Sequence, residues 1–310
     1  MPKIVISEFM DEAAIAEHLG SFEVVYDPGL VDQPERLARE AADADALIVR
    51  NRTQVRGALL QAAAKLVCVG RLGVGLDNID VAACETRGID VFPATGANDV
   101  SVAEYVVGTA MVLLRGAYFS TPAMAEGGWP RNALSSGREI SGKRLGLVGF
   151  GSIARETALR ALALGMSVAG RDPYVPADSP AWGDVIPMSL EELLRTSDVV
   201  SLHVPLTEGT KGLIGADALA SMRTDAILIN AARGGIVDEA ALANALKEGR
   251  LGGAALDVFD AEPLKGDAAK IFEGVPNLIL TPHVAGVTAE SNVRVSDVTA
   301  RSVARRLKGA

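Results

Sequence analysis

One short stretch constrains the fold of this chain more than any other: an apolar run at 145–148 followed by a Gly-x-Gly-x-x-Ala pattern at 149–154. The apolar run is typical of a buried parallel strand, and the residues after it have helical spacing. Gly149 permits a tight turn, Gly151 has no side chain to keep a ligand from the backbone, and Ala154 lets the helix pack close to the sheet. The stretch predicts a strand, a turn and a helix of a doubly wound α/β domain.

An acidic residue follows the next apolar run. Asp172 comes after the run from Met166 to Ala169 and lies 21 positions beyond Gly151. At that spacing a carboxylate accepts hydrogen bonds from the ribose hydroxyls of an adenosine, and the helix after the glycines presents its N–H groups to phosphates. Together the glycines and Asp172 predict a dinucleotide site, whereas the glycine pattern alone is equally consistent with a structural turn.

Composition excludes several other classes. The chain has 310 residues, 49% of them hydrophobic, and a net charge of −9. This length allows two domains, and the negative charge argues against nucleic acid or an anionic membrane as a partner. The longest apolar stretch, Tyr105 to Leu114, is short for a membrane span, and the N-terminus lacks a signal-peptide layout. Cys68 and Cys84 have no neighbouring metal-type ligands. We therefore expect a cytoplasmic protein with reduced core thiols and no metal site.

Strand and helix patterns alternate along the chain, which predicts parallel α/β sheets. In the first series the expected strands are Lys3–Ser7, Val24–Tyr26, Ala46–Arg50, Leu66–Gly70 and Ile89–Phe92. In the second series they are Leu145–Val148, Met166–Ala169, Asp198–His203, Ala226–Asn230, Gly253–Val258 and Asn277–Thr281. The expected helices include Asp11–Leu19, Pro34–Ala41, Asn78–Glu85, Leu190–Arg195 and Glu239–Glu248. Six strands with the glycine motif on the first predict a dinucleotide-binding sheet.

A long apolar helix separates the two series. Asn98 is its expected N-cap, and the helix reaches Leu114 or Arg115. Because the helix is apolar nearly all round, it is either a core helix or, as we favour, one that crosses between domains and packs against a second subunit. A final helix, Ala289–Leu307, is expected to return to the first domain.

Three chemically suitable side chains follow consecutive strands of the second series. They are Arg233, Glu262 and His283, and Asp257 lies within the middle strand. Ligands of open α/β sheets meet the carboxyl ends of the strands, so these residues are expected at the dinucleotide edge. A guanidinium grips a carboxylate bidentately, an imidazole exchanges a proton, and a carboxylate beside it fixes its tautomer. Each residue alone is better explained as a solvated or structural side chain, and it is their joint occurrence at consecutive strand ends beside the glycine motif that favours a site.

Together these motifs resemble the D-isomer-specific 2-hydroxyacid dehydrogenases. The resemblance covers essentially the whole chain and is carried by the segments 149–154, 230–235, 257–263, 281–286, 73–80 and 101–104, together with Asp172. It implies a Rossmann domain, residues 99–284, inserted in a flavodoxin-like substrate domain formed by 1–98 and 285–310. It also implies a homodimer, NAD as cofactor, and a catalytic trio of Arg233, Glu262 and His283.

The same resemblance implies further contacts with the cofactor. The backbone of Ser152 and Ile153 would hold the pyrophosphate, and Asp257 would contact the nicotinamide carboxamide. The cofactor cleft would be lined by Val204, Ala231 and Gly286. Two departures stand out: Ala154 replaces the third glycine, and Arg171 precedes Asp172. Arg171 suits the 2′-phosphate of NADP, but Asp172 would repel that phosphate, so NAD is favoured.

The first series supplies candidate substrate contacts. Arg50 and Arg52 follow a strand, and the turn at Val74 and Gly75 offers backbone N–H groups to a carboxylate. Extra cations would suit a second anionic group on a small 2-hydroxy or 2-keto acid, although loop arginines are often merely solvated.

The segments 50–53 and 129–131 look closer to the sulfolactate dehydrogenases of the family than to its 3-phosphoglycerate dehydrogenases or its glyoxylate/hydroxypyruvate reductases. A D-configured carbon bearing CH2-sulfonate takes the (S) label, so (S)-3-sulfolactate fits. A non-enzymatic, NAD-sensing co-repressor stays open as an alternative. Of the other histidines, His203 is expected to line the cofactor cleft and His18 to be a surface residue.

Overall fold

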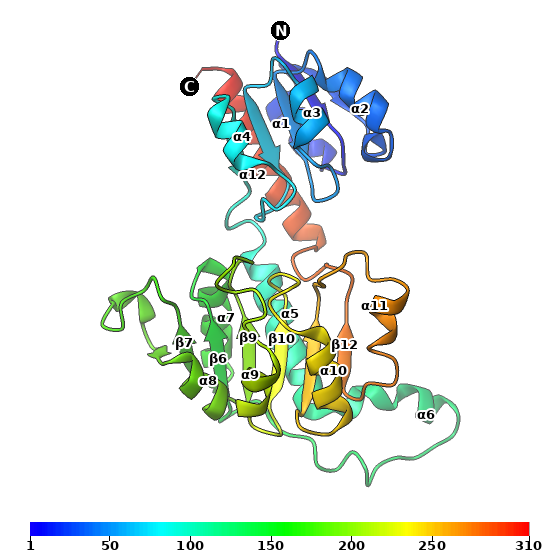
Figure 1. The fold of residues 1–310 in the computed structure, drawn as a ribbon, viewed down its shortest axis with the longest axis vertical. Helices are drawn as coiled ribbons and strands as arrows, with labels where there is room; N and C mark the ends of the chain where they lie inside the picture. Colours follow the sequence, from blue (N-terminus) through cyan, green and yellow to red (C-terminus); the bar gives the residue numbers. More distant parts are fainter. Residues whose placement is uncertain (310) are drawn as a thin grey trace. The chain divides into compact units, whose positions relative to one another are not determined.

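The computed structural model describes residues 1–309, which form two compact units (Figure 1). Unit 1 consists of Met1–Asn98 together with the chain from Val287 onward, and unit 2 is Asp99–Gly286. Each unit has one parallel sheet with helices on both faces. The α/β architecture expected from the alternating patterns is therefore confirmed.

The sheet of unit 1 has five parallel strands in the order β2-β1-β3-β4-β5. Its strands are β1 (Lys3–Ile6), β2 (Glu23–Tyr26), β3 (Ala46–Val49), β4 (Cys68–Arg71) and β5 (Asp90–Pro93). Its helices are α1 (Glu12–Leu19), η1 (Leu30–Asp32), α2 (Pro34–Ala41), α3 (Gly57–Ala62), α4 (Val81–Thr86) and α12 (Ala289–Leu307). All five strands lie where the sequence predicted them, to within two residues at each end.

Helices cover both faces of this sheet. Apolar side chains of α1 and α12 pack on one face, and those of α2, α3 and α4 pack on the other. Gly70 of β4 lets α12 approach closely, since a Cβ there would lie 2.7 Å from Thr299 and 2.8 Å from Val303. The last helix thus returns to the first sheet, as its position after the second strand series suggested.

The sheet of unit 2 has seven parallel strands in the order β12-β11-β10-β9-β6-β7-β8. Its strands are β6 (Arg144–Val148), β7 (Ser167–Arg171), β8 (Ile186–Pro187), β9 (Val199–Leu202), β10 (Ile227–Asn230), β11 (Gly253–Leu256) and β12 (Leu278–Leu280). Six of these were expected, so the predicted count was wrong by one. The missed strand, β8, is a two-residue edge strand, and the proline at its end interrupts the short apolar run at 185–188.

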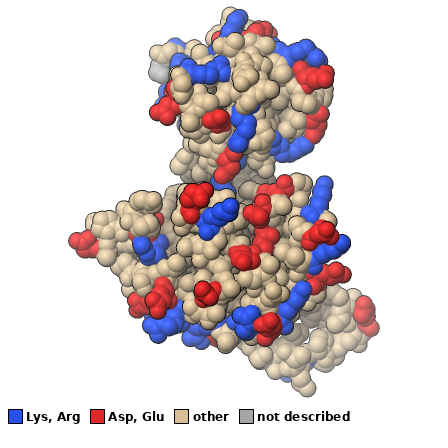
Figure 2. All heavy atoms as spheres, in the orientation of Figure 1, with Lys and Arg blue, Asp and Glu red and all other residues tan. Residues whose placement is uncertain are grey.

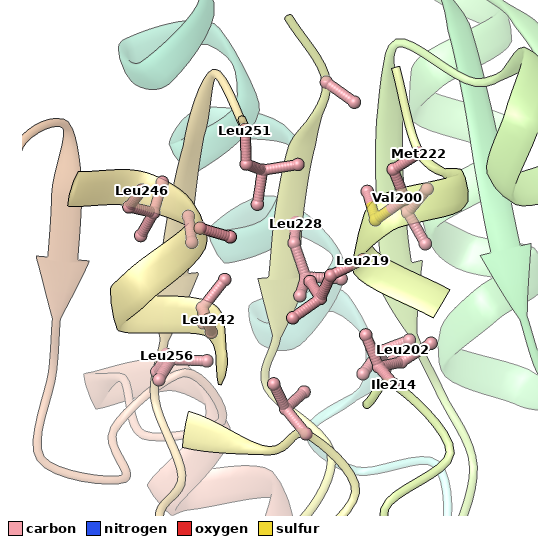
Figure 3. Close-up of a cluster of buried hydrophobic side chains, with 14 of the residues drawn as sticks. Val200, Leu202, Ile214, Leu219, Met222, Leu228, Leu242, Leu246, Leu251 and Leu256 are labelled. Carbon is pink, nitrogen blue, oxygen red and sulfur yellow. The ribbon is translucent and has the colours of Figure 1, made fainter. Parts of the chain in front are cut away.

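The helices of unit 2 are α5 (Asp99–Arg115), η2 (Ala117–Ser120), α6 (Thr121–Ala125), α7 (Ser152–Ala163), η3 (Pro180–Trp182), α8 (Leu190–Thr196), α9 (Ala216–Ser221), α10 (Glu239–Lys247) and α11 (Asp267–Lys270). On one face, α8, α9 and α10 pack leucines and other apolar side chains on β9, β10 and β11 (Figure 3). On the other face, α5 and α7 pack against each other and the sheet. This layering fixes the strands whose ends carry the candidate site.

Two local predictions were wrong. Asn98 does not cap α5 with its side chain, because its Oδ1 is buried without a hydrogen-bond partner among the described residues. His18 is not a free surface residue: its side chain is 17% exposed, and its Nε2 lies 2.7 Å from Asp297 of α12. That contact joins positions 279 residues apart, and local sequence does not encode it.

Charges of both signs are interspersed over the face shown in Figure 2. Among residues 1–309 no single helix is long and apolar enough to cross a membrane. Within this range, α5 and the segment 117–125 are together long and apolar enough, but the two helices are bent by 65° relative to each other.

Candidate active site

The glycine turn after β6 is shaped for close approach. Gly149 has a φ of +93°, and a Cβ there would lie 2.5 Å from the carbonyl oxygen of His203, so only glycine fits. A Cβ at Gly151 would meet open space, and Gly151 caps α7 without a side-chain hydrogen bond. The N–H groups of Ser152 and Ile153 begin this 12-residue helix, where intrahelical acceptors are missing. The turn therefore fits a phosphate group.

Asp172 follows β7 beside this turn. Its Oδ2 accepts a hydrogen bond from the N–H of Phe150 (2.8 Å), and its Oδ1 accepts one from Tyr174 (2.9 Å). Each carboxylate oxygen has a second lone pair, so both can still accept a ribose hydroxyl. Asp172 thus shapes the glycine turn as well as lining the edge of the sheet.

A pocket of about 610 Å³ opens at this sheet edge. It is lined by Gly170, Arg171, Asp172, Pro173, Val175, Pro176, Ala177, Trp182, Pro187, Met188, Ser189 and Glu192. The apolar part of this wall, built around Trp182 and Met188, was not identified from sequence because it comes from the irregular segment before α8. Arg171 and Asp172 line the same pocket, so the two residues expected to act oppositely on cofactor choice lie side by side.

Behind the turn, His203 and Val204 follow β9 directly. A Cβ at Gly149 would also lie 3.0 Å from Val204, so this residue adjoins the glycine turn. The Nε2 of His203 lies 2.9 Å from the Oγ of Ser201, and burial lowers the pKa of His203 to about 4. A neutral imidazole held in this way is poorly suited to carry a proton. The expectation that His203 lines the cofactor cleft stays a prediction.

Arg233 follows β10 on a loop whose backbone is fixed by Asn230. The Nδ2 of Asn230 donates to the carbonyl of Arg233 (2.9 Å), and its Oδ1 accepts from the N–H of Ala232 (3.1 Å). Gly234 lies directly against the next loop, since a Cβ there would be 1.8 Å from the carbonyl oxygen of Phe259. This close packing brings the Arg233 loop, which begins at Ala231, against the loop that carries Glu262.

Asp257, directly after β11, is 1% exposed and holds the turn after β12. Its Oδ1 accepts from the Thr281 hydroxyl (2.6 Å) and the Val284 N–H (2.8 Å), and its Oδ2 accepts from the Ala285 N–H (2.8 Å). These three donors bracket His283, whose φ of +56° is unusual for a residue other than glycine. The expected contact of Asp257 with nicotinamide therefore depends on the one acceptor position that remains on Oδ2.

Helix α5, which packs on one face of the sheet, extends this network. The hydroxyl of Tyr105, on α5, lies 2.7 Å from the Oγ1 of Thr281. Because Thr281 gives its own proton to Asp257, Tyr105 must be the donor in this pair. Burial raises the pKa of Tyr105, which keeps its hydroxyl protonated. A directional chain of hydrogen bonds thus runs from α5 to the turn that carries His283.

Glu262 and His283 form a close pair. The Oε2 of Glu262 lies 2.8 Å from the Nδ1 of His283, and its Oε1 accepts from the Phe259 N–H (3.0 Å). Partial burial works to raise the pKa of Glu262, but these two hydrogen bonds and the nearby charge of Arg233 outweigh burial, so the pKa lies below its usual value. An ionised carboxylate only accepts, so Nδ1 carries the proton and the Nε2 of neutral His283 has a free lone pair.

The structure therefore brings Arg233, Glu262 and His283 together at the carboxyl ends of three adjacent strands. The side chain of His283 is 40% exposed, which leaves its ring accessible to a ligand. Gly286 follows the same turn, and Ala231 begins the neighbouring loop. A guanidinium beside an oriented imidazole can bind a carboxylate and move one proton. Among the described residues no cluster of three potential metal ligands occurs.

In unit 1, the loop after β3 carries Arg50 and Arg52. The guanidinium of Arg50 donates to Asn292 Oδ1 (2.5 Å) and lies 5.8 Å from the ring centre of Phe9. The guanidinium of Arg52 pairs with Asp32 and remains 58% exposed. Both arginines have protein partners, but only Arg50 is partly buried, and the exposed guanidinium of Arg52 is still compatible with the solvated-loop alternative.

The second element expected to bind substrate in unit 1 is the turn after β4. Val74 and Gly75 lie in it, beyond a glycine that Arg71 covers: a Cβ at Gly73 would be 1.6 Å from the Arg71 guanidinium. The φ of Gly73 is +144°, so glycine suits this position for its conformation as well as for its size. Arg71 and Gly73 therefore restrict the backbone that leads into Val74 and Gly75.

In sequence and in structure, this chain resembles known 2-hydroxyacid dehydrogenases. A family model described as the D-isomer specific 2-hydroxyacid dehydrogenase, NAD binding domain, matches residues 107–285. An (S)-sulfolactate dehydrogenase from Chromohalobacter salexigens is 55% identical over 308 residues, which are 99% of this chain and 99% of that protein. A D-3-phosphoglycerate dehydrogenase from Methanocaldococcus jannaschii is 38% identical, and the match covers 100% of this chain but 58% of that protein. A crystal structure of D-lactate dehydrogenase from Aquifex aeolicus, complexed with NAD and lactic acid, has a TM-score of 0.85 at 27% identity, covering 99% of this chain and 96% of that one.

Proposed function

This chain belongs to the D-isomer-specific 2-hydroxyacid dehydrogenases, a family of NAD-dependent oxidoreductases, and we propose that it oxidises (S)-3-sulfolactate to 3-sulfopyruvate. The observation that carries the choice of substrate is the 55% identity, over nearly the full length of both chains, to a protein named for that activity. Two arginines, Arg50 and Arg52, lie on the loop after β3, and two cations there support a substrate with a second anionic group.

The proposed chemistry assigns one role to each member of the trio. Arg233 binds the substrate carboxylate bidentately and polarises the carbon that reacts. His283 accepts the hydroxyl proton at Nε2 while Glu262 holds the proton on Nδ1 and stabilises the imidazolium that forms. Bound NAD supplies the acceptor for the hydride that leaves C2. In the reverse direction the imidazolium returns its proton to the keto oxygen.

We further propose how the cofactor and the rest of the substrate are held. Ser152 and Ile153 bind the pyrophosphate with their N–H groups, and Asp172 binds the adenosine ribose in the pocket lined by Trp182. Arg50, Arg52 and the backbone of Val74 and Gly75 bind anionic groups of the substrate. Unit 2 forms the cofactor domain, and unit 1 forms the substrate domain. Val204, Ala231, Asp257 and Gly286 line the nicotinamide end.

A homodimer is also part of the proposal. The segment after α5 exposes several large apolar side chains, among them Tyr118 (67%) and Trp129 (76%), and Met111 on α5 itself is 44% exposed. Apolar patches of this kind mark interaction surfaces, and twofold dimers are the commonest assemblies. Trp129→Glu should convert a dimer to monomer in sedimentation experiments.

The free, buried thiols of Cys68 and Cys84 and the use of NAD support a cytoplasmic location.

A substrate panel tests the proposed reaction. Formation of NADH is followed by absorbance with (S)-3-sulfolactate, 3-phospho-D-glycerate, D-glycerate and D-lactate. The highest kcat/KM is expected for sulfolactate, and Arg52→Ala should raise its KM while sparing D-lactate. A preference for phosphoglycerate or for monoanionic acids would contradict the choice of substrate. Saturable NAD binding without oxidation of any of these acids would favour the co-repressor alternative.

A further inference from the structure

A buried carboxylate lies beneath the loop that carries the two candidate arginines. Glu8 lies two residues after the end of β1, and it is 5% exposed. Its Oε1 accepts hydrogen bonds from the N–H groups of Arg50 (2.8 Å) and Thr53 (3.0 Å), and its Oε2 accepts one from the N–H of Arg52 (3.1 Å). One side chain thus binds three backbone donors of a four-residue loop.

The carbonyl groups of the same loop are held from another direction. The Nδ2 of Asn78 donates to the carbonyl oxygens of Arg50 (3.1 Å) and Thr53 (2.7 Å). The Oγ of Ser7 lies 2.8 Å from the Oγ1 of Thr53. Glu8 and Asn78 therefore fix both kinds of backbone group, so the path of the loop is set before any side chain reaches a substrate.

Glutamate suits this position better than glutamine. Burying a carboxylate is costly unless hydrogen bonds compensate it, and three N–H donors do so here. An amide has only one acceptor oxygen, so a glutamine could satisfy the two donors at Oε1 but would place its NH2 group against the N–H of Arg52. Of the three N–H groups, that of Arg52 is therefore the one that would lose its acceptor if residue 8 were a glutamine.

We propose that Glu8 is a positioning residue for substrate selectivity, which fixes the 50–53 loop so that the guanidinium of Arg52 meets the second anionic group of the substrate. The proposal rests on the proposed function, because it takes that substrate to be dianionic. The guanidinium of Arg52 pairs with Asp32 on the surface. Exposed pairs of this kind are weak, so a sulfonate can take the place of Asp32.

The test is Glu8→Gln, compared with Glu23→Gln, a matched change of an exposed glutamate in the same unit. Glu8→Gln should raise the KM for (S)-3-sulfolactate about three- to tenfold, part of what losing one charge-assisted hydrogen bond would cost. Its kcat and its KM for D-lactate should stay within about twofold of the unmutated enzyme. In an Arg52→Ala background Glu8→Gln should add nothing, because its effect passes through Arg52. Glu23→Gln should behave as the unmutated enzyme.

Equal rises in KM for both acids, no rise at all, or an additive effect in the Arg52→Ala background would overturn the proposal in favour of a purely structural role. If Glu8→Gln does not fold, as judged by circular dichroism and NAD binding, Glu8→Asp takes its place; it keeps the charge and should give a smaller but still selective rise.

If the unmutated enzyme does not oxidise sulfolactate, the proposed substrate is wrong, and loop positioning is measured by amide hydrogen exchange. The N–H of Arg52 should then lose more protection in the variant than those of Arg50 and Thr53. Equal losses would overturn the positioning role itself.

Discussion

Replacing Glu262 by glutamine separates the charge of this residue from its shape. In the structure the two oxygens of Glu262 have different partners: Oε2 meets the Nδ1 of His283 at 2.8 Å, and Oε1 accepts from the Phe259 N–H at 3.0 Å. The low pKa of the carboxyl keeps it ionised near neutral pH, so it accepts from both partners. Glutamine has one acceptor oxygen and can serve only one of them.

The geometry decides which partner the glutamine serves. If its oxygen stays on Phe259, its NH2 group faces Nδ1, and the proton of neutral His283 must move to Nε2, where the ring can no longer accept a proton. If the amide turns over, the partly buried Phe259 N–H loses its acceptor at a cost of about 1–3 kcal/mol. The first arrangement is therefore favoured by about 5- to 150-fold, since each 1.4 kcal/mol is a factor of ten.

We therefore expect Glu262→Gln to lower kcat for hydroxy acid oxidation by about one to two orders of magnitude, which is the factor by which the inactive tautomer is favoured. Stopped-flow absorbance of NADH measures kcat, and protein fluorescence measures NAD binding, which should stay near its original value. Asp260→Asn is the control, because it removes an exposed charge close to Glu262 without touching the imidazole. A kcat within about threefold of the unmutated enzyme would refute the tautomer argument and leave Glu262 a structural role.

Three further predictions follow from the same unit. Asp172 should reject a 2′-phosphate, so kcat/KM should be much higher with NAD than with NADP, and Asp172→Ala should narrow that gap; equal efficiencies before mutation would contradict this. Because His203 has a folded pKa of about 4 and an ordinary unfolded value, the unfolded chain binds its proton first as pH falls. Stability should decline between pH 6.5 and 4, by about 3 kcal/mol at most, and urea titrations of His203→Asn should show a shallower decline. Tyr105→Phe removes the donor to Thr281 and should cost about 1 kcal/mol of stability, with a several-fold lower kcat; unchanged values for both would remove Tyr105 from the network around Asp257.

The elements that sequence reasoning located are those whose signal is local. Apolar runs of four or five residues mark the parallel strands because such strands are buried on both faces. The strand ends then predict which side chains gather, since the carboxyl ends of parallel strands share one edge. Arg233, Glu262 and His283 could be placed together for that reason. The strand β8 escaped detection because its pairing to β7, not its composition, makes it a strand.

Residues that hold the site from a distance could not be found in this way. Glu8 binds N–H groups 42 to 45 positions away, and Tyr105 meets Thr281 across 176 positions. Asn292 of the last helix meets Arg50 across 242 positions. Glu8 and Asn292 neither interrupt nor complete a periodic pattern, so each resembles an ordinary surface position until the chain is folded. Tyr105 is hidden for another reason, because it is the first residue of the apolar stretch 105–114.

Two buried carboxylates, Glu8 and Asp257, solve the same physical problem in the two units. Each accepts three hydrogen bonds from groups of one turn, and that turn carries a side chain proposed to meet the substrate. At His283 the energies can be compared: a left-handed conformation of a residue other than glycine costs about 1–3 kcal/mol, whereas hydrogen bonds to a charged acceptor contribute about 1.5–3 kcal/mol each. The bonds to Asp257 offset the backbone cost, so the imidazole is held in place before substrate binds. A neutral amide in either position would leave one donor without an acceptor, and the turn would relax toward a conformation that aims its side chain elsewhere.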